Sequence, residues 1–257
     1  NHEPKKAVKA VQKDTDTKTK VPKVKMKTKD IPFFILLIAL AGLFISPILL
    51  VLMNSFKGKL YIGTEPFAFP NETSFVGFDN YLEGADKIGF LPAFFTSLFI
   101  TVFAVLLLVL CTSMCAWFIV RVKKWYSQLL YLLCAFSMIV PFQMVMYPMT
   151  QVASKLHLNN IIGIIFVYLG FGAGLAVFMF VGFIKSVPLE IEEAAMIDGC
   201  GPVRTYFLVV FPILKPTAIT VAILDAMWIW NDYLLPYLLL GSSETKTLPM
   251  AIQYLRG

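Results

Sequence analysis

Long apolar runs alternate with short polar segments along most of this chain. Each run approaches or exceeds the roughly 20 residues that a helix needs to cross the hydrocarbon layer of a bilayer. The pattern predicts an all-α membrane protein, a polytopic helical bundle with five spans in this chain. The expected spans cover residues 32–53, 94–120, 129–150, 161–184 and 213–240.

The composition places the chain in the same class. Hydrophobic residues make up 58% of it, charged residues only 15%, and the mean hydropathy is +0.75. Residues 1–30 hold ten of the 22 lysines and arginines and almost nothing apolar, so this segment cannot bury enough surface to fold alone. We therefore expect a disordered basic cytoplasmic tail at 1–30 and a transmembrane domain at 31–257.

The distribution of basic residues predicts the orientation in the membrane. Cytoplasmic segments carry an excess of lysine and arginine. An N-terminus in the cytoplasm places sixteen basic residues inside and six outside. Residues 54–93 are then an external loop, either a contact surface for a partner protein or a solvated connector. The basic tail sets topology, and it also stands where anionic membrane lipid would attract it.

The segment between the last two spans reads as two short helices outside the bilayer. Pro188 suits a first helical turn, with Ser186 before it as a cap. Acidic residues then favour the positive end of the helix dipole; they are Glu190, Glu192 and Glu193. Gly199 supplies a break. Pro202 opens the second helix, and Pro212 marks the return to the membrane.

The same segment carries a spaced motif. It reads Glu193-Ala194-Ala195, then Gly199, then Val209-Val210-Phe211-Pro212. This resembles the E-A-A loop of permease subunits of bacterial ABC importers, with Val209 and Phe211 as mild departures. Other stretches, such as Trp230-Asn231-Asp232-Tyr233-Leu234, extend the resemblance over most of 32–257. It is closest to the carbohydrate and oligosaccharide branch, similar to the second permease of maltose-type importers with the type I fold.

The resemblance implies a sugar-importing transport subunit of the bacterial cytoplasmic membrane. The implied partners are a second permease, two ATP-binding cassette ATPase subunits and an extracytoplasmic sugar-binding protein, with no role for nucleic acid. ATP is used by the ATPase subunits, and this chain binds no cofactor. The loop at 185–212, called the coupling loop below, would dock into an ATPase groove. Its implied contact residues are Glu193, Ala194, Ala195, Gly199 and Pro212.

Polar residues in the last span suggest a substrate path. Asp225 lies near mid-membrane, where an ionisable group usually faces a cavity or a partner. Trp228 and Asp232 follow on the same helix face. Aromatic rings and carboxylates suit sugars, so we expect a path lined by Asp225, Trp228, Asn231 and Asp232, with Gln143 from span three. The alternative gives these residues packing, interface and helix-terminal roles, and for Asn231 and Asp232 that structural role is favoured.

Prolines in span three predict a local kink. Pro141 and Pro148 both lie within 129–150. A membrane helix tolerates such a kink when its neighbours satisfy the freed backbone groups. We expect either a gating element or a static packing feature there.

Enzymatic function finds little support. The sequence has no GxxxxGK[ST] phosphate loop, no HExxH and no CxxC, and neither histidine pairs with a nucleophile. No catalytic or metal site is expected. A rival hypothesis makes Asp225 and Asp232 an acid and base, but seven helical residues separate them by about 10 Å. Two further alternatives are a permease for another small solute and a membrane scaffold that transports nothing.

The permease family usually has a sixth span after the equivalent of Thr247-Leu248-Pro249. This sequence ends at Gly257 and does not begin with methionine. We expect it to be part of a longer chain rather than a natural five-span subunit.

Overall fold

The computed structural model describes residues 30–241, 243–253 and 255, and within these residues the regular elements are helices. One isolated antiparallel bridge joins Lys57 and Phe75. The predicted all-α class is confirmed. The expected disordered tail at 1–30 lies outside the described residues, apart from Asp30.

The chain divides into two compact units, residues 1–80 and 81–257, within what was expected as one domain at 31–257. In the first unit, α2 (Ile31–Ser55) is followed by the short helix α3 (Lys59–Thr64). The loop beyond α2 folds on itself. Lys57 is buried and donates from Nζ to the Glu65 carbonyl at 2.9 Å, while the Asn80 amide donates to the carbonyls of Ser55 and Lys57.

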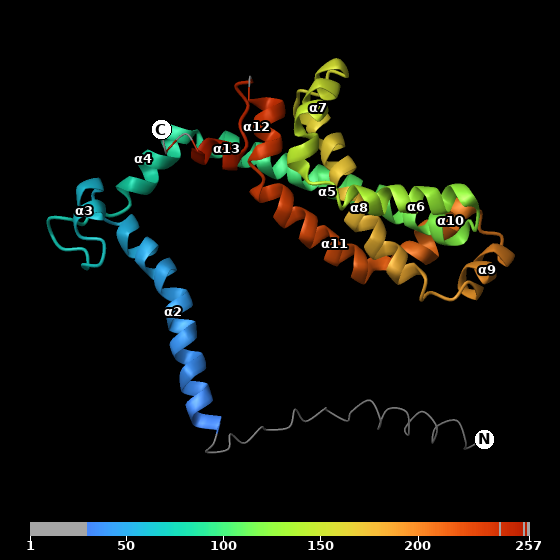
Figure 1. The fold of residues 1–257 in the computed structure, drawn as a ribbon, viewed down its shortest axis with the longest axis horizontal. Coiled ribbons are helices and arrows are strands. Elements are labelled where there is room, and N and C mark those ends of the chain that lie inside the picture. Colours follow the sequence, from blue (N-terminus) through green and yellow to red (C-terminus); the bar gives the residue numbers. More distant parts are fainter. Residues whose placement is uncertain (1–29, 242, 254, 256–257) are drawn as a thin grey trace, which may run out of the picture. The chain divides into compact units, whose positions relative to one another are not determined.

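Three long helices form the core of the second unit. They are α5 (Phe90–Arg121), α8 (Ile161–Ile184) and α11 (Phe211–Asn231), and each packs against the other two. In Figure 1 they run together as the green, gold and orange ribbons. Small residues on α8 allow close packing, as a methyl group added to Gly172 would overlap the Leu108 side chain of α5. The described helix α4 (Asp79–Ile88) precedes α5.

The ends of this bundle differ. The short helices α9 (Glu190–Ile197) and α10 (Pro202–Thr205) lie at one end, at the right of Figure 1. The helices α12 (Leu234–Leu240) and α13 (Leu248–Gln253) follow α11 at its other end, and α13 packs on α5, where Ser97 Oγ accepts from the Leu248 N–H at 2.7 Å.

Span three is not the continuous helix expected for 129–150. It consists of α6 (Trp125–Ser137) and α7 (Phe142–Lys155), which meet at an angle of 110°. Pro141 stands directly before α7 with an extended ψ of 137°. Proline has no N–H to continue the helix and restricts the residue before it, so the chain bends there. Pro148 lies inside α7 without ending it.

The last expected span, 213–240, is also divided. The helix begins earlier, at Pro202, and ends at Asn231. Asp232 then adopts an extended ψ of 124°, and its carboxylate accepts from the Leu234 N–H that opens α12. Four described helices are long and apolar enough to span a membrane, or five spans result if the bent α6–α7 pair counts as one.

Candidate functional site

The coupling loop at 185–212 places α9 across the end of the bundle. The helix begins at Glu190, two residues after Pro188, and no side chain caps it. The predicted cap by Ser186 is wrong, because the Ser186 hydroxyl donates instead to the Phe183 carbonyl at the end of α8. What fixes α9 against the bundle is a side chain in its first turn.

Glu192 points inward from α9 and is only 2% exposed. Its carboxylate accepts from Arg121 Nη2 at 2.7 Å and Nε at 3.0 Å, and from Trp117 Nε1 at 2.9 Å. Arg121 Nη2 also donates to the Val187 carbonyl at 3.1 Å. A buried charge pair of this kind is costly to break on one side only, because the remaining charge loses its partner. The contact therefore fixes α9 to the end of α5.

A second set of contacts involves Trp117 and Ser113, which lie one and two helical turns before Arg121 on the same face of α5. The hydroxyls of Ser113 and Tyr206 are hydrogen-bonded at 2.6 Å, and both side chains are fully buried. The ring centroids of Trp117 and Tyr206 lie 5.5 Å apart. Ser113, Trp117 and Arg121 follow at spacings of four residues, so they form one stripe along α5. This stripe contacts the helix before Gly199 and the helix after it.

Sequence reasoning missed this stripe. In the sequence pattern Arg121 is one of the sixteen basic residues expected on the cytoplasmic side, and Glu192 is one of three acidic residues near the positive end of a helix dipole. The available signal was weak. Trp117 and Arg121 are four residues apart at the end of an apolar run, and Glu192 shares a helix face with Leu189 and Met196. Nothing in the spacing along the chain indicates that the two groups meet.

The motif residues of α9 face outward. Glu193 and Ala194 are exposed and Ala195 is half-buried. Gly199 ends the helix with a φ of +85°, a conformation that favours glycine. The Gly199 N–H donates to the Met196 carbonyl and the Cys200 N–H to the Ala195 carbonyl, both at 3.0 Å, which is a Schellman motif. Glycine is therefore required at this position of the motif.

The second helix of the loop is not separate from the membrane span. It begins at Pro202, as expected, but continues through the π-helical segment η2 (Tyr206–Val210) directly into α11. Pro212 thus lies exposed in the first turn of α11 and does not mark a break. The wider π turn comes directly before this proline, which offers no N–H to the preceding turn. Among the described residues of the coupling loop, α9 is therefore the short helix that does not continue into a span.

The expected path residues are only partly brought together. Tyr168 on α8 joins two of them, since its hydroxyl donates to the Asp232 carboxylate at 3.0 Å and its ring meets Trp228 edge-on at 5.5 Å. Asp225 is 5% exposed and faces α8, where a methyl on Gly172 would lie 3.6 Å from Asp225 Oδ1. Tyr168 was not among the predicted residues.

The other two candidates stand apart from this group. The Asn231 amide turns back to the Met227 carbonyl of its own helix at 2.7 Å, as the structural alternative has it. Gln143 is exposed on α7, and among the described residues it makes no hydrogen bond to Asp225, Trp228 or Asp232. The candidate path is thus reduced to Asp225, Trp228 and Asp232, with Tyr168 in contact with the last two, and these four residues are called the path group below. Asp232 also accepts from the Leu234 N–H, which is the helix-terminal role of the structural alternative.

Comparison with known proteins assigns the architecture. Residues 108–256 match the family described as "Binding-protein-dependent transport system inner membrane component". The chain is 42% identical over 217 residues to the probable starch degradation products transport system permease protein AmyC of Thermoanaerobacterium thermosulfurigenes, covering 84% of this chain and 78% of that protein. It is 37% identical over 221 residues to the multiple sugar-binding transport system permease protein MsmG of Streptococcus mutans, with the same coverage.

A solved structure shares the fold. A chain in the crystal structure of a bacterial ABC transporter that imports the acidic polysaccharide alginate superimposes with a TM-score of 0.72, at 22% identity, over 89% of this chain and 81% of that one. The family match covers more than half of the present chain and includes the coupling loop, the stripe residues Ser113, Trp117 and Arg121, and the path group. The chain thus belongs to the inner membrane components of binding-protein-dependent transport systems.

Proposed function

We propose that this chain is the noncatalytic transmembrane subunit of an ATP-driven importer of sugars or oligosaccharides. In this proposal it forms part of the translocation path and is coupled through α9 to cytoplasmic ATPase subunits. The observation that carries the proposal is the buried contact of Glu192 with Arg121 and Trp117, because it makes α9 a rigid extension of α5. The names of the similar permeases support sugars as the cargo.

The exposed face of α9 suits a protein groove. Ile197 is 86% exposed and Met196 48%, although α9 lies beyond the ends of the apolar spans. Ala194 adds no bulk, so a partner surface can approach the backbone closely. Large apolar side chains exposed to water on a solvent-side helix mark an interaction surface. We assign this face to an ATPase subunit.

The closing movement of the ATPase subunits would be transmitted to the membrane helices α5 and α11 by two routes. One runs from Glu192 to Arg121 and into α5. The other passes through the Gly199 turn and η2 into α11, which carries Asp225 and Trp228. Because Tyr206 of η2 is also bonded to Ser113 of α5, both routes act on the same pair of helices. Packed helices move as rigid elements, so a displacement of α9 would shift the candidate path group.

The proposed assembly contains a second permease, two ATPase subunits and an extracytoplasmic sugar-binding protein. ATP is bound and hydrolysed by the ATPase subunits alone. The N-terminus and α9 lie in the cytoplasm, in agreement with the excess of basic residues on that side. The path group then lies toward the outer half of the membrane, where the binding protein delivers its sugar.

The test is ATP-dependent uptake of labelled oligosaccharides into proteoliposomes that hold the co-expressed complex. Gly199→Val should abolish coupled uptake while the complex still assembles, because valine strains the αL position. Gly201→Val is the matched control, since Gly201 has an ordinary φ of −69° and, like Gly199, open space around it. A complex that imports another small solute but no sugar would contradict the assignment of sugars as the cargo. A transport-competent Gly199→Val complex would refute the coupling role.

A further inference from the structure

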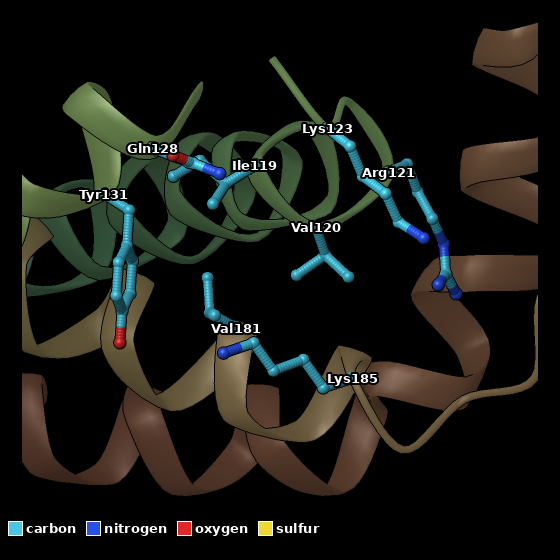
Figure 2. Close-up of a pocket in the computed structure, with 8 residues that line it drawn as sticks. All are labelled: Ile119, Val120, Arg121, Lys123, Gln128, Tyr131, Val181 and Lys185. Carbon is cyan, nitrogen blue, oxygen red and sulfur yellow. The ribbon is translucent and has the colours of Figure 1, made fainter. Parts of the chain in front are cut away.

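A pocket of about 460 Å³ opens between the ends of α5, α6 and α8 that lie nearest the coupling loop. In Figure 2 the Lys123 side chain extends toward Arg121 on one side of the pocket, and the Lys185 side chain extends toward Val181 on the other. Arg121 is already neutralised by Glu192. Neither lysine lies within ion-pair distance of an acidic side chain among the described residues, whose ion pairs are Lys87–Glu83 and Arg121–Glu192. The pocket therefore holds two uncompensated positive charges.

Both lysines are exposed, and one of them also has an aromatic partner. Lys185 Nζ lies 5.7 Å from the centroid of the Tyr131 ring, a cation–π contact that draws the ammonium toward the pocket. Gln128 adds an amide that can donate hydrogen bonds. Donors from the linker after α5, from α6 and from the turn after α8 thus line one space, as expected for a site that takes an anion with several acceptor oxygens.

Part of the pocket wall is apolar. It is formed by Ile119, Val120 and Val181, which belong to the membrane-spanning helices α5 and α8. Trp125 and Tyr126, at the start of α6, are 73% and 43% exposed beside it. Aromatic side chains of this kind collect at the level of lipid head groups. The pocket therefore lies at the boundary between the hydrocarbon layer and water.

We infer that this pocket binds the phosphate group of an anionic phospholipid, with Lys123 and Lys185 around the phosphate and an acyl chain along the apolar wall. The assignment to the cytoplasmic leaflet rests on the orientation in the proposed function. Free phosphate would supply the same charge but would leave the apolar wall uncovered. An acidic loop of the ATPase is the less fitting occupant, since the ATPase is assigned to the outer face of α9 and the pocket opens between spans.

The pocket places the bound lipid next to Arg121. Arg121 lines the pocket and at the same time holds Glu192 of α9. A phosphate in the pocket would lie beside the ion pair that fixes the coupling helix. The lipid would thus contribute to the position of Arg121 and, through it, to the position of α9.

The experiment is a lipid titration of the co-expressed complex in detergent, followed by native mass spectrometry. The probes are phosphatidylglycerol, phosphatidylcholine as the neutral lipid, and inorganic phosphate as competitor. The test variant is Lys123→Gln/Lys185→Gln. The matched control is Lys124→Gln/Lys215→Gln, which removes the same charge from two exposed lysines that do not line the pocket. Arg121 is left intact because it pairs with Glu192.

We expect the test variant to bind phosphatidylglycerol about 30-fold more weakly, since loss of each lysine contact to the phosphate costs about 1 kcal/mol, a roughly fivefold factor. The control should lose far less, and the neutral lipid should not respond to either change. Equal losses in the two variants would mean diffuse surface charge and would overturn the site. Displacement of the lipid by inorganic phosphate at equal concentration would assign the site to free phosphate instead.

Two further measurements, gel filtration and sugar uptake, distinguish the remaining outcomes. Loss of the ATPase subunits from the test variant on gel filtration, with lipid binding retained, would assign the lysines to a protein partner and overturn the lipid site. Sugar uptake is measured on the same preparations. Lysine-dependent lipid binding by a complex that imports no sugar would support the lipid site while counting against the proposed function. Unchanged thermal unfolding shows that the variants are folded.

Discussion

Arg121 Nη2 lies 2.7 Å from the carboxylate of Glu192, although 71 residues separate them in the chain. The pair joins the last residue of a 32-residue apolar helix to the first turn of a short helix outside the spans. Glu192 is buried and Arg121 is mostly buried, so neither charge is fully hydrated. The position of α9 relative to α5 therefore depends on this contact.

Arg121→Ala should destabilise the complex by about 3 kcal/mol, because it leaves the Glu192 carboxylate buried without its cation. The double variant Arg121→Met/Glu192→Met should regain most of the stability but not the coupling of ATPase activity to uptake. Thermal unfolding of the purified complex and the ratio of ATP hydrolysed to sugar imported measure the two effects.

The exposed pair Lys87–Glu83 serves as the control, since its side chains are 61% and 66% exposed. The lysine hydrogen bond lowers the pKa of Glu83 from its ordinary value, but solvent screens the interaction. Lys87→Ala should leave unfolding and coupling nearly unchanged. An equal effect of Arg121→Ala and Lys87→Ala would show that burial does not strengthen the first pair.

Tyr206→Phe should lower stability by about 1 kcal/mol, since it removes one buried hydrogen bond to Ser113. The loss stays small because the Ser113 hydroxyl keeps the Val109 carbonyl as a partner. Uptake per ATP hydrolysed should fall as well, because no hydrogen bond then joins η2 to α5 at this position. Tyr147→Phe, at a residue 72% exposed, is the control in both assays. A fall in stability with full coupling would give Tyr206 a packing role only.

Gly172→Ala should destabilise the bundle by about 1–3 kcal/mol, because the added methyl overlaps the Leu108 side chain, which is fully buried. Leu108→Ala should cost less stability in the Gly172→Ala chain than in the unaltered chain, because the new methyl fills part of the space that the leucine leaves. Gly170→Ala, two residues earlier, meets nothing within 4 Å and should be neutral or slightly stabilising. Thermal unfolding of these variants tests the close approach of α5 and α8. Equal effects at 170 and 172 would contradict it.

Asp225→Asn should reduce the rate of sugar uptake about tenfold, because a carboxylate accepts stronger hydrogen bonds from sugar hydroxyls than an amide does, while assembly and basal ATP hydrolysis persist. Asparagine keeps the size of the side chain and removes the charge. Asn231→Ala, which loses only a bond to its own helix, should leave uptake nearly intact. Unimpaired uptake by Asp225→Asn would return this residue to an interhelical packing role.

Local signals predicted much of the fold. The expected range 161–184 coincides with α8, because Asn160 caps the helix by accepting from the Gly163 N–H and the apolar run ends before Lys185. The turn at Gly199 also follows from sequence, since a Schellman motif needs only neighbouring residues.

Other features depend on geometry that the hydrophobic pattern does not contain. Apolar residues continue through both Pro141 and Asp232, so hydropathy alone joins α6 to α7 and α11 to α12. The burial of Glu192 depends on α5 and α9 meeting in space. Tyr168 was hidden for the same reason, because its partners Trp228 and Asp232 lie on another helix.

The separation of Arg121 from Glu192 also sets a time scale for biogenesis. The ribosome must add 71 residues after Arg121 before Glu192 exists. At about 5–20 residues per second this takes roughly 4–14 s. During that interval the long side chain of Arg121 can keep its guanidinium at the water interface, beyond the end of the newly inserted α5. The Arg121–Glu192 ion pair that fixes α9 therefore forms late, only after α8 has been synthesised.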